Sequence, residues 1–253
     1  MDLQLADKVA LVTGGSRGIG AAICRALAAE GARVAINYAQ SAERAQALAG
    51  ELTERHGVQA VALRADMACQ ADIPALFDSV QQALGPIDVL VNNAAYCPSG
   101  PIESYTAEEW EKTFRVNVTA AFVCSQEHIR RLRARGARGK IVNIVSQAAF
   151  LGSTSGHLPY DASKGALVSM TRSIAREVGR EGINVNAVAP GLVRTEMVAN
   201  VLAKKMDFYL SRIPLGRIAE PEDVAHAVCF LASDVSSYMT GTTMDLTGGL
   251  LMR

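Results

Sequence analysis

The sequence predicts an α/β fold, a doubly wound parallel sheet of about seven strands with helices on both faces. Short runs rich in Val, Ile and Ala alternate with longer, alanine-rich amphipathic segments along the chain. The short runs are mostly apolar throughout instead of alternating apolar with polar residues, as strands covered on both faces do. No linker, repeat or low-complexity segment interrupts the chain, so we expect one domain over residues 1–253.

This alternation predicts where each strand and helix lies along the chain. Strands are expected at KVALV (8–12), RVAINY (33–38), VQAVALR (58–64), IDVLVNN (87–93), KIVNIVS (140–146), INVNAVAP (183–190) and TTMDLTG (242–248). The amphipathic segments between them are predicted as helices, near 18–30, 41–56, 70–84, 107–135, 159–180 and 222–233. Right-handed crossovers would bring the strands side by side in one sheet. Residues 191–221 interrupt the alternation, and we expect a substrate loop or lid there.

Composition and charge argue against several kinds of function. The 253 residues are 49% hydrophobic and 20% charged, which is enough to bury one sizeable core. Lys plus Arg and Asp plus Glu each number 25, so the formal net charge is zero and nothing indicates a nucleic-acid partner. No segment approaches the roughly 20 apolar residues of a membrane helix, so we expect no membrane partner.

Cysteine and histidine usage favour a cytoplasmic protein without a metal site. The five cysteines are scattered, odd in number and without CxxC spacing, which favours reduced thiols over a disulfide framework. The N-terminal segment MDLQLADKVALVTGG lacks the basic start and long apolar run of a signal peptide. The four histidines are isolated and form no HExxH pattern, so we expect no metal ligands.

A glycine-rich loop, TGGSRGIG (13–20), follows the first predicted strand and runs into a helical segment. Glycine lets the backbone approach a pyrophosphate closely, and the N-terminus of the next helix offers free N–H groups. The spacing of Gly14, Gly18 and Gly20 differs from the GxGxxG fingerprint, and no Walker-type Gly-Lys-Ser/Thr follows. A tight turn alone would also need glycine, but the place after strand one favours nucleotide binding.

The end of the second strand indicates which nucleotide binds. An acidic residue there would accept hydrogen bonds from an adenosine ribose 2′-OH and repel a 2′-phosphate. The segment NYAQS (37–41) has no acid, and the first acid after it is Glu43. Arg17 in the glycine loop could meet a 2′-phosphate, although it could equally face solvent. The missing acid and the available cation favour NADP(H), with NAD(H) as the alternative.

A tyrosine and a lysine lie four positions apart in PYDASKGAL (159–167), at the start of a predicted helix. At this spacing Tyr160 and Lys164 would be neighbours on one helix face. An unperturbed tyrosine has a pKa of about 10, too high for efficient proton transfer near neutrality, and a nearby ammonium lowers that pKa. A YxxxK pair also arises by chance, as a tyrosine packed against a solvated lysine, so the pair needs support from other residues.

Two further polar residues lie where a catalytic site could form. Ser146 ends the predicted strand KIVNIVS, and open α/β sheets bind ligands beyond the carboxyl ends of their strands. Its hydroxyl could orient a substrate carbonyl or stabilise oxyanion charge, although a serine there can also simply form a turn. Asn117 lies within a long apolar helical stretch, where it could satisfy a backbone group, bend the helix or hold a water.

These motifs together resemble the short-chain dehydrogenase/reductase family, in its single-domain branch with a TGxxxGxG cofactor loop and a YxxxK active site. The resemblance covers almost the whole chain, because the motifs occur in the family's order: TGGSRGIG (13–20), Asp66, NNAA (92–95), Asn117, Ser146, Tyr160, Lys164 and PGLVRT (190–195). It implies a Rossmann-like fold and hydride transfer between nicotinamide and a carbonyl or secondary alcohol. In one departure, Ala95 replaces the family's usual glycine and adds a methyl beside the expected cofactor path.

The resemblance implies roles for four catalytic residues. Tyr160 would be the general acid/base, and Ser146 would hold the substrate oxygen. Lys164 would lower the tyrosine pKa and bind the nicotinamide ribose. Asn117 would position a water in the proton relay.

The resemblance also implies a set of cofactor-binding residues. Asp66 would contact the adenine, and Val193 and Thr195 would hold the nicotinamide carboxamide. The full set is Gly14, Ser16, Arg17, Gly18, Ile19, Gly20, Asn37, Asp66, Asn93, Ala94, Tyr160, Lys164, Pro190, Gly191, Val193 and Thr195.

The substrate hypothesis depends on the family more than on single residues. Similarity to 3-oxoacyl-(acyl carrier protein) reductases makes 3-oxoacyl-thioester reduction the leading hypothesis, and a sugar, polyol or cyclic-alcohol dehydrogenase is the alternative. Residues 95–99, 147–158 and 191–218 are expected to line the pocket. His157 and Cys97 could contact the substrate, and the alternatives are a solvent-facing histidine and an inert thiol.

The sequence leaves two questions undecided: which partners the protein has, and whether it is an enzyme or a non-catalytic binding protein. An acidic acyl carrier protein could dock on the basic stretch 129–140, although the same cations could be a solvated helix end that complements the helix dipole. The resemblance implies a homotetramer that pairs the helices near 107–135 and 159–180. The alternative class is a non-catalytic dinucleotide-binding sensor or scaffold. Such a protein would lack Tyr160, Lys164 or Ser146, and all three are present.

Overall fold

The computed structural model describes residues 2–153, 156–196 and 206–252, and it contains a sheet of seven parallel strands. The strands are β1 (Val9–Val12), β2 (Arg33–Tyr38), β3 (Ala60–Arg64), β4 (Val89–Asn92), β5 (Gly139–Ile144), β6 (Ile183–Pro190) and β7 (Thr243–Leu246). Their order is β3-β2-β1-β4-β5-β6-β7, so the winding direction reverses between β1 and β4. Open sheets of this kind bind ligands at such a switch point, beyond the carboxyl ends of the strands.

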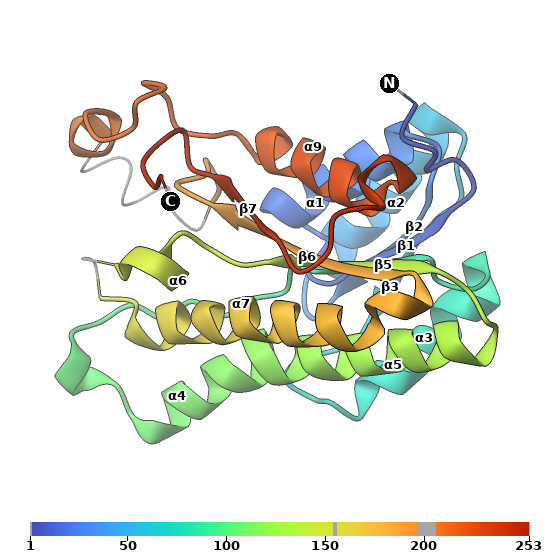
Figure 1. The fold of residues 1–253 in the computed structure, drawn as a ribbon, viewed down its shortest axis with the longest axis horizontal. Coiled ribbons are helices and arrows are strands. Elements are labelled where there is room, and N and C mark those ends of the chain that lie inside the picture. Colours follow the sequence, from blue (N-terminus) through green and yellow to red (C-terminus); the bar gives the residue numbers. More distant parts are fainter. Residues whose placement is uncertain (1, 154–155, 197–205, 253) are drawn as a thin grey trace.

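Helices cover both faces of the sheet (Figure 1). They are α1 (Gly18–Ala29), α2 (Ala42–His56), α3 (Asp72–Leu84), α4 (Ala107–Phe114), α5 (Ala120–Ala134), α6 (Ala148–Leu151), α7 (Leu158–Val178) and α9 (Pro221–Ala232). Helices α1, α2 and α9 pack on one face, and α3, α5 and α7 pack on the other. The predicted doubly wound α/β fold is confirmed. Within the described ranges, no helix is long and apolar enough to cross a membrane.

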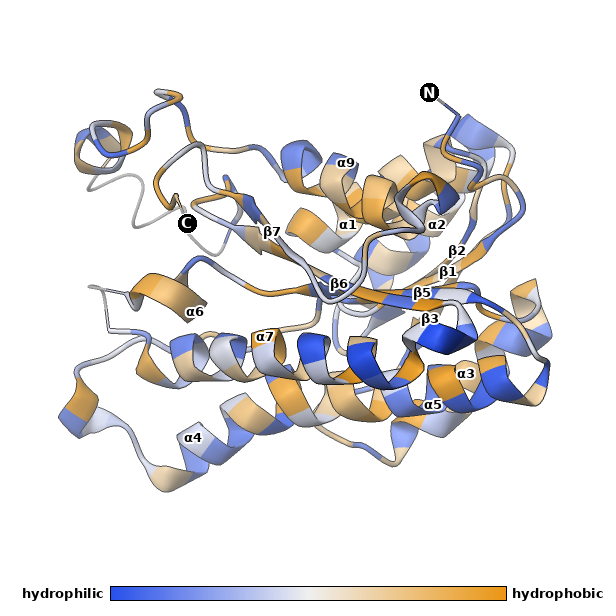
Figure 2. Cartoon of the chain, viewed as in Figure 1, coloured by the Kyte–Doolittle hydropathy of each residue, from blue (hydrophilic) through white to orange (hydrophobic). Residues whose placement is uncertain are grey.

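The core consists of two apolar layers, one on each face of the sheet. Neighbouring residues of one strand contribute to opposite layers: Val12 packs with α1 and α9, whereas Leu11 packs with α3 and α5. Figure 2 shows hydrophobic residues along the strands and hydrophilic ones on outward surfaces of the helices. Because both faces of each central strand are buried, nearly every strand position must be apolar, which explains the unbroken apolar runs.

A buried chain of polar side chains joins the middle strands to α7. The Asn92 amide donates to Asn143 Oδ1 at 2.9 Å, and the Asn143 amide donates to Thr171 Oγ1 at 2.9 Å. These three residues are at most 4% exposed. Because such hydrogen bonds cannot be replaced by water, they fix the position of α7 relative to β4 and β5.

The structure differs from the sequence predictions in the interior of one helix, in the end of one strand and in one additional short helix. The predicted helix 107–135 contains a π-helical turn, Arg115–Thr119, between α4 and α5. Apolar spacing does not reveal such a turn, because the residues on either side keep helical periodicity. The predicted strand 140–146 ends at Ile144, which leaves Ser146 beyond the sheet. Helix α6 is too short for periodicity to predict.

The predicted substrate loop, residues 191–221, lies partly outside the described residues. In its described part, Val193 forms an isolated parallel bridge with Ala219, and residues 206–210 are helical. A small apolar cluster around Ile213 packs against the C-terminal segment. This part of the loop therefore folds over the region just beyond β6 and β7.

A buried histidine makes the fold sensitive to acid. His128 on α5 is 1% exposed, and burial together with the nearby Arg135 cation lowers its pKa from 6.5 to about 3. The unfolded chain binds a proton below pH 6.5 that the folded protein excludes, so stability is lost as the pH falls through this range. We expect a loss of about 2–3 kcal/mol in unfolding free energy between neutrality and about pH 4.5 from this residue.

Urea unfolding at the two pH values tests this expectation with two variants. His128→Leu should remove that share of the acid sensitivity, whereas the matched change at the exposed His226 on α9 should keep it. An equal loss of stability in the wild type and in His128→Leu would contradict the assignment.

Candidate active site

The glycine loop after β1 has a backbone that only glycine allows at two positions. Gly14 has a φ of +62°, and a Cβ on it would lie 3.0 Å from the Ala94 Cα. A Cβ on Gly20 would collide with the Gly14 carbonyl oxygen and would lie 2.7 Å from the Asn93 amide nitrogen. The glycines thus keep side chains away from the α1 N-terminus, whose first N–H groups have no partner within the helix, as a pyrophosphate site requires.

Two asparagines hold this loop from the inside. The Asn37 Oδ1 accepts from the Gly14 N–H at 3.2 Å, and its amide donates to the Ala65 carbonyl at 3.0 Å. The Asn93 amide donates to the carbonyls of Thr13 and Gly14 at 2.9 and 3.0 Å. Because Asn37 is 1% exposed, the structure gives its side chain a supporting place beneath the loop instead of one on the cofactor's side.

The other residues implied in cofactor binding lie beyond the strand ends. Ser16 and Ile19 belong to the glycine loop and α1, Asp66 follows β3, and Ala94 follows β4. Four more, Pro190, Gly191, Val193 and Thr195, end or follow β6. A Cβ on Gly18 would lie 3.5 Å from the Thr195 side chain, so the segment after β6 closely approaches the glycine loop.

Ala95 fits the site without backbone strain. Among the described residues, the non-glycine residues with positive φ are Gln4 and Asp7. Ala95 therefore has a backbone conformation that any residue can adopt, and its methyl adds bulk without strain.

Two cations lie at the rim of the loop. Arg44, in the first turn of α2, contacts the Glu196 carboxylate at 2.9 Å, and Arg17 approaches the same carboxylate at 3.7 Å. All three side chains are more than half exposed. Arg44 and Glu196 are not among the residues predicted from the sequence. Arg44 could have been predicted, because it lies in the first turn of the helix after β2, near the end of the second strand. Glu196 could not, because only the three-dimensional fold brings it to this rim.

Lys164, predicted from the sequence as a catalytic residue, is buried at the carboxyl end of β5. Lys164 is 2% exposed, and its ammonium donates to the Ile144 carbonyl at 2.6 Å. It lies 5.4 Å from the centre of the Tyr160 ring, so the two side chains share one helix face as predicted. Burial lowers the pKa of Lys164 to about 8.

The phenol of Tyr160 is placed against Ser146. Desolvation raises the pKa of Tyr160 above its ordinary value, and a hydrogen bond with the Ser146 hydroxyl acts in the opposite direction. The lowered phenol pKa expected from sequence is therefore not produced by the protein's own groups. Burial is the largest cause of the raised pKa, and the nearby Cys97 and Asp161 add to it.

Asn117 lies in the π-turn and connects three segments. Its Oδ1 accepts from the Tyr96 N–H at 2.7 Å, and its amide donates to the Tyr96 carbonyl at 2.9 Å and to Ser163 Oγ at 2.9 Å. Ser163 in turn donates to the Tyr160 carbonyl at 2.7 Å. Asn117 thus positions the start of α7. The sequence analysis did not identify Ser163, although it lies one turn after Tyr160 on the same helix.

A thiol and an imidazole line the wall beside the phenol. Cys97 Sγ lies 3.7 Å from His157 Nδ1, which is 2.9 Å from the Pro98 carbonyl oxygen. Because a carbonyl oxygen only accepts, this nitrogen carries a proton and cannot deprotonate the thiol. Burial raises the pKa of Cys97 to about 11, so the thiol is neutral and inert.

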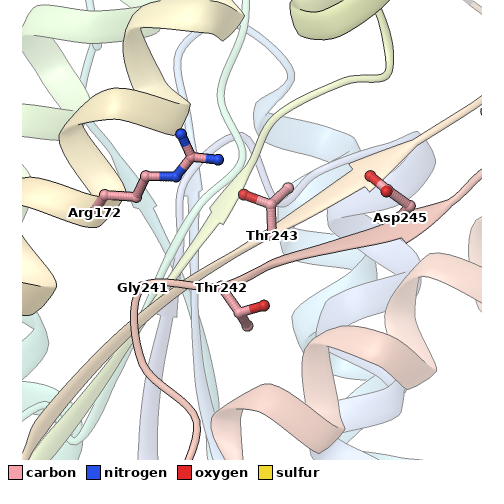
Figure 3. Close-up of a pocket in the computed structure, with 5 residues that line it drawn as sticks. All are labelled: Arg172, Gly241, Thr242, Thr243 and Asp245. Atoms are coloured by element: carbon pink, nitrogen blue, oxygen red, sulfur yellow. The ribbon is translucent and has the colours of Figure 1, made fainter. Parts of the chain in front are cut away.

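A groove of about 450 Å³ lies between α7 and the edge strand β7. Arg172 on α7 and residues of the edge strand β7, including Thr243 and Asp245, line it together with Gly241 and Thr242 (Figure 3). Ser146, Tyr160 and Lys164 are not among the residues that line it.

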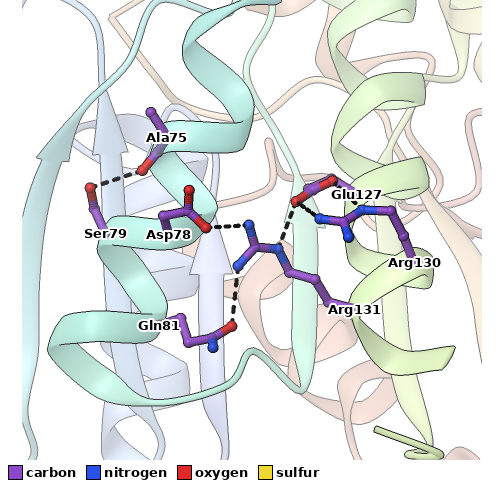
Figure 4. A network of polar contacts seen from close by, with 7 residues as sticks. All are labelled: Ala75, Asp78, Ser79, Gln81, Glu127, Arg130 and Arg131. Atoms are coloured by element: carbon purple, nitrogen blue, oxygen red, sulfur yellow. Dashed lines mark hydrogen bonds and ion pairs between the residues drawn. The ribbon is translucent and has the colours of Figure 1, made fainter. Parts of the chain in front are cut away.

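The basic stretch 129–140 is largely neutralised by neighbouring acids. Arg131 donates to Asp78 on α3 at 2.6 Å and to Glu127 at 2.7 Å, and Arg130 also binds Glu127 (Figure 4). The pairs Arg133–Glu181, Arg135–Asp88 and Lys140–Asp234 bring in further acids. The sequence offered a solvated helix end as the alternative to a docking surface, and these ion pairs favour that alternative.

Comparison with known proteins identifies relatives over the whole chain. A family model described as Enoyl-(Acyl carrier protein) reductase matches residues 14–251. A 3-oxoacyl-[acyl-carrier-protein] reductase of Aquifex aeolicus is 37% identical over 99% of this chain and 100% of its own. A 3alpha-hydroxysteroid dehydrogenase of Mediterraneibacter gnavus is 39% identical over 98% of each chain.

Solved structures agree with this match. A dehydrogenase/reductase of Sinorhizobium meliloti is 38% identical, with a TM-score of 0.91 over 99% of this chain and 98% of its own. A putative gluconate dehydrogenase of Agrobacterium tumefaciens is 30% identical, with a TM-score of 0.94 over 100% and 99% of the two chains. The chain belongs to the short-chain dehydrogenase/reductase family of oxidoreductases.

Proposed function

We propose that this protein is an NADP(H)-dependent oxidoreductase that interconverts a carbonyl and a secondary alcohol, with 3-oxoacyl-thioester reduction as the leading reaction. The observation that carries the proposal is the buried Lys164 ammonium, 5.4 Å from the ring of Tyr160, with Ser146 against the phenol. A non-catalytic dinucleotide sensor would not need to keep an ammonium buried at this cost. We treat residues 1–253 as one catalytic domain.

Four residues would have separate roles in the reaction: Ser146, Tyr160, Lys164 and Asn117. Ser146 would donate to the substrate carbonyl oxygen and hold it beside Tyr160, which would give that oxygen its proton. Lys164 would stabilise the phenolate left behind. Asn117 uses its side chain within the protein, so a relay water at this point would be held by its backbone carbonyl in the π-turn. A bound nicotinamide dinucleotide supplies the hydride, or accepts it in oxidation.

The residues around the glycine loop fit a dinucleotide with a 2′-phosphate. The α1 N-terminus, kept free of side chains by the glycines of the loop, would bind the pyrophosphate, and the cations of Arg17 and Arg44 would meet the 2′-phosphate in place of the Glu196 carboxylate. NAD(H) remains the alternative, because the pyrophosphate cradle serves both dinucleotides.

The substrate proposal draws on the relatives' names. The Aquifex aeolicus relative is named a 3-oxoacyl-[acyl-carrier-protein] reductase, which supports 3-oxoacyl thioesters. The paired arginines of the stretch 129–140 leave little free charge for an acyl carrier protein there, so we expect small thioesters to be reduced as well. The second candidate is a sugar, polyol or cyclic-alcohol dehydrogenase, supported by the relatives named for a hydroxysteroid and gluconate.

We also propose a cytoplasmic homotetramer. All five cysteines are free, as a reducing compartment would keep them. Strand β7 is an edge strand, and proteins cover such edges, often with another copy of the chain.

Removing the phenol hydroxyl tests the proton donor. We expect Tyr160→Phe to lower the turnover of a 3-oxoacyl thioester by at least about a hundredfold, because general acid catalysis contributes that much. The NADPH affinity should stay nearly unchanged in a fluorescence titration. The matched change at the fully exposed Tyr238 should have no effect on either. Undiminished turnover in Tyr160→Phe would remove this residue from the mechanism, and wild-type NADPH binding without turnover of any carbonyl would favour the sensor alternative.

Removing the two rim cations tests the cofactor choice. We expect Arg17→Ala with Arg44→Ala to weaken NADPH binding about tenfold or more and to leave NADH binding within about twofold, because only NADPH carries the 2′-phosphate. Arg55→Ala, at the far end of α2, is the matched control. Equal losses for both dinucleotides, or a tighter wild-type complex with NADH, would contradict the NADP(H) assignment.

A further inference from the structure

Two segments that are far apart in the chain meet close to the phenol of Tyr160. One follows β4 and comprises residues 97–105, and the other, residues 156–157, leads into α7. We call them the wall segments. The Cys97 thiol of the first segment is close enough to Tyr160 and Lys164 to affect the pKa of both side chains. The wall segments therefore form part of the surroundings of these two groups.

Hydrogen bonds tie the two wall segments together in both directions. The Gly100 N–H donates to the Gly156 carbonyl at 2.9 Å, and the His157 Nδ1–H donates to the Pro98 carbonyl at 2.9 Å. A Cβ on Gly156 would collide with the Gly100 carbonyl oxygen. Each segment thus gives a donor to a carbonyl of the other, and the two backbones approach so closely that residue 156 has to be glycine.

The hydroxyl of Tyr105 lies between the same two carbonyls. It donates to the Gly156 carbonyl at 2.7 Å and lies 3.3 Å from the Pro98 carbonyl oxygen. Desolvation raises the pKa of Tyr105 above its ordinary value of 10, so the phenol keeps its proton and stays a donor at neutral pH. Tyr105 is not among the residues predicted from the sequence. Its hydroxyl is the side-chain group that connects the end of the first wall segment to the second.

We propose that Tyr105 is a positioning residue: its hydroxyl holds the wall segments together, and they in turn hold the substrate carbonyl against Ser146 and Tyr160. Asn117 already fixes the backbone of Tyr96 just before the first segment, so Tyr105 fixes the other end of that segment. Connecting loops move unless such contacts hold them, and a displacement of about 1 Å in a reacting group can cost about a hundredfold in rate. The inference rests on the proposed function and adds a residue that acts through the wall segments.

Removing one hydroxyl tests this role. Tyr105→Phe keeps the ring and deletes the donor. We expect its kcat for NADPH-dependent reduction of the N-acetylcysteamine thioester of acetoacetate to fall about tenfold, which corresponds to one buried hydrogen bond. The NADPH affinity in a fluorescence titration should stay within about twofold, because the residues implied in cofactor binding lie outside the wall segments. Tyr238→Phe, at a fully exposed tyrosine, is the matched control.

A second variant disturbs the same contact from the other segment. Gly156→Ala places a methyl against the Gly100 carbonyl and should lower kcat by a similar factor. Gly152→Ala is the matched control, because both glycines have a positive φ but a Cβ on Gly152 would meet nothing within 4 Å. Tyr105 and Gly156 act through one contact, so the double variant should lose little more than either single variant.

Urea unfolding of Tyr105→Phe separates a positioning role from a purely structural one. A loss of stability with an unchanged kcat would overturn the inference and leave the proposed function in place. Losses in kcat that multiply in the double variant with Gly156→Ala would also overturn it, since the two residues would then act independently. If the wild type binds NADPH but reduces no carbonyl, the proposed function fails and this inference fails with it.

Discussion

The structure depends on a lysine ammonium that is held out of water. Lys164 is 2% exposed, and its Nζ donates to the Ile144 carbonyl at 2.6 Å. Burying a charge is costly unless the group is hydrogen-bonded, so the last carbonyl of β5 has to lie where α7 presents this side chain. The same contact sets the distance to Tyr160 on the helix. Together with the buried polar chain from β4 to α7, this contact holds α7 and Tyr160 at the carboxyl end of β5.

Several polar residues that the family resemblance places at the site serve as its frame. Asn37 and Asn93 support the glycine loop from inside, and Asn117 ties the π-turn to the start of α7. The amides of Asn37 and Asn117 both donate and accept, and the Asn93 amide donates to two backbone carbonyls. This frame leaves the α1 N-terminus and the Ser146 and Tyr160 hydroxyls available to ligands.

The sequence predicts the fold well, because short apolar runs that alternate with amphipathic helical segments are typical of parallel strands covered on both faces. Motif order also brings Ser146, Tyr160 and Lys164 to one end of the sheet. The raised pKa of Tyr160 could not be predicted, since it depends on how deeply the fold buries the phenol.

Contacts between residues far apart in the chain account for the other differences. The sequence places Arg131 in a basic stretch that could be a free surface. In the fold, Asp78 of α3 forms an ion pair with it. Arg44 and Glu196 are 152 positions apart, and only the crossing of the loop after β6 over α2 unites them. The π-turn around Asn117 is a change of hydrogen-bond register, which side-chain spacing does not encode.

The buried ammonium is tested most directly by titrating the lysine side chains of the protein by carbon NMR. The account predicts one lysine with a pKa of about 8, whose signal is missing in Lys164→Met. If the Lys164 signal instead titrated near the ordinary value of 10.5, its ammonium would be in contact with water. The placement of Tyr160, Ser146 and the substrate carbonyl around it would then be contradicted.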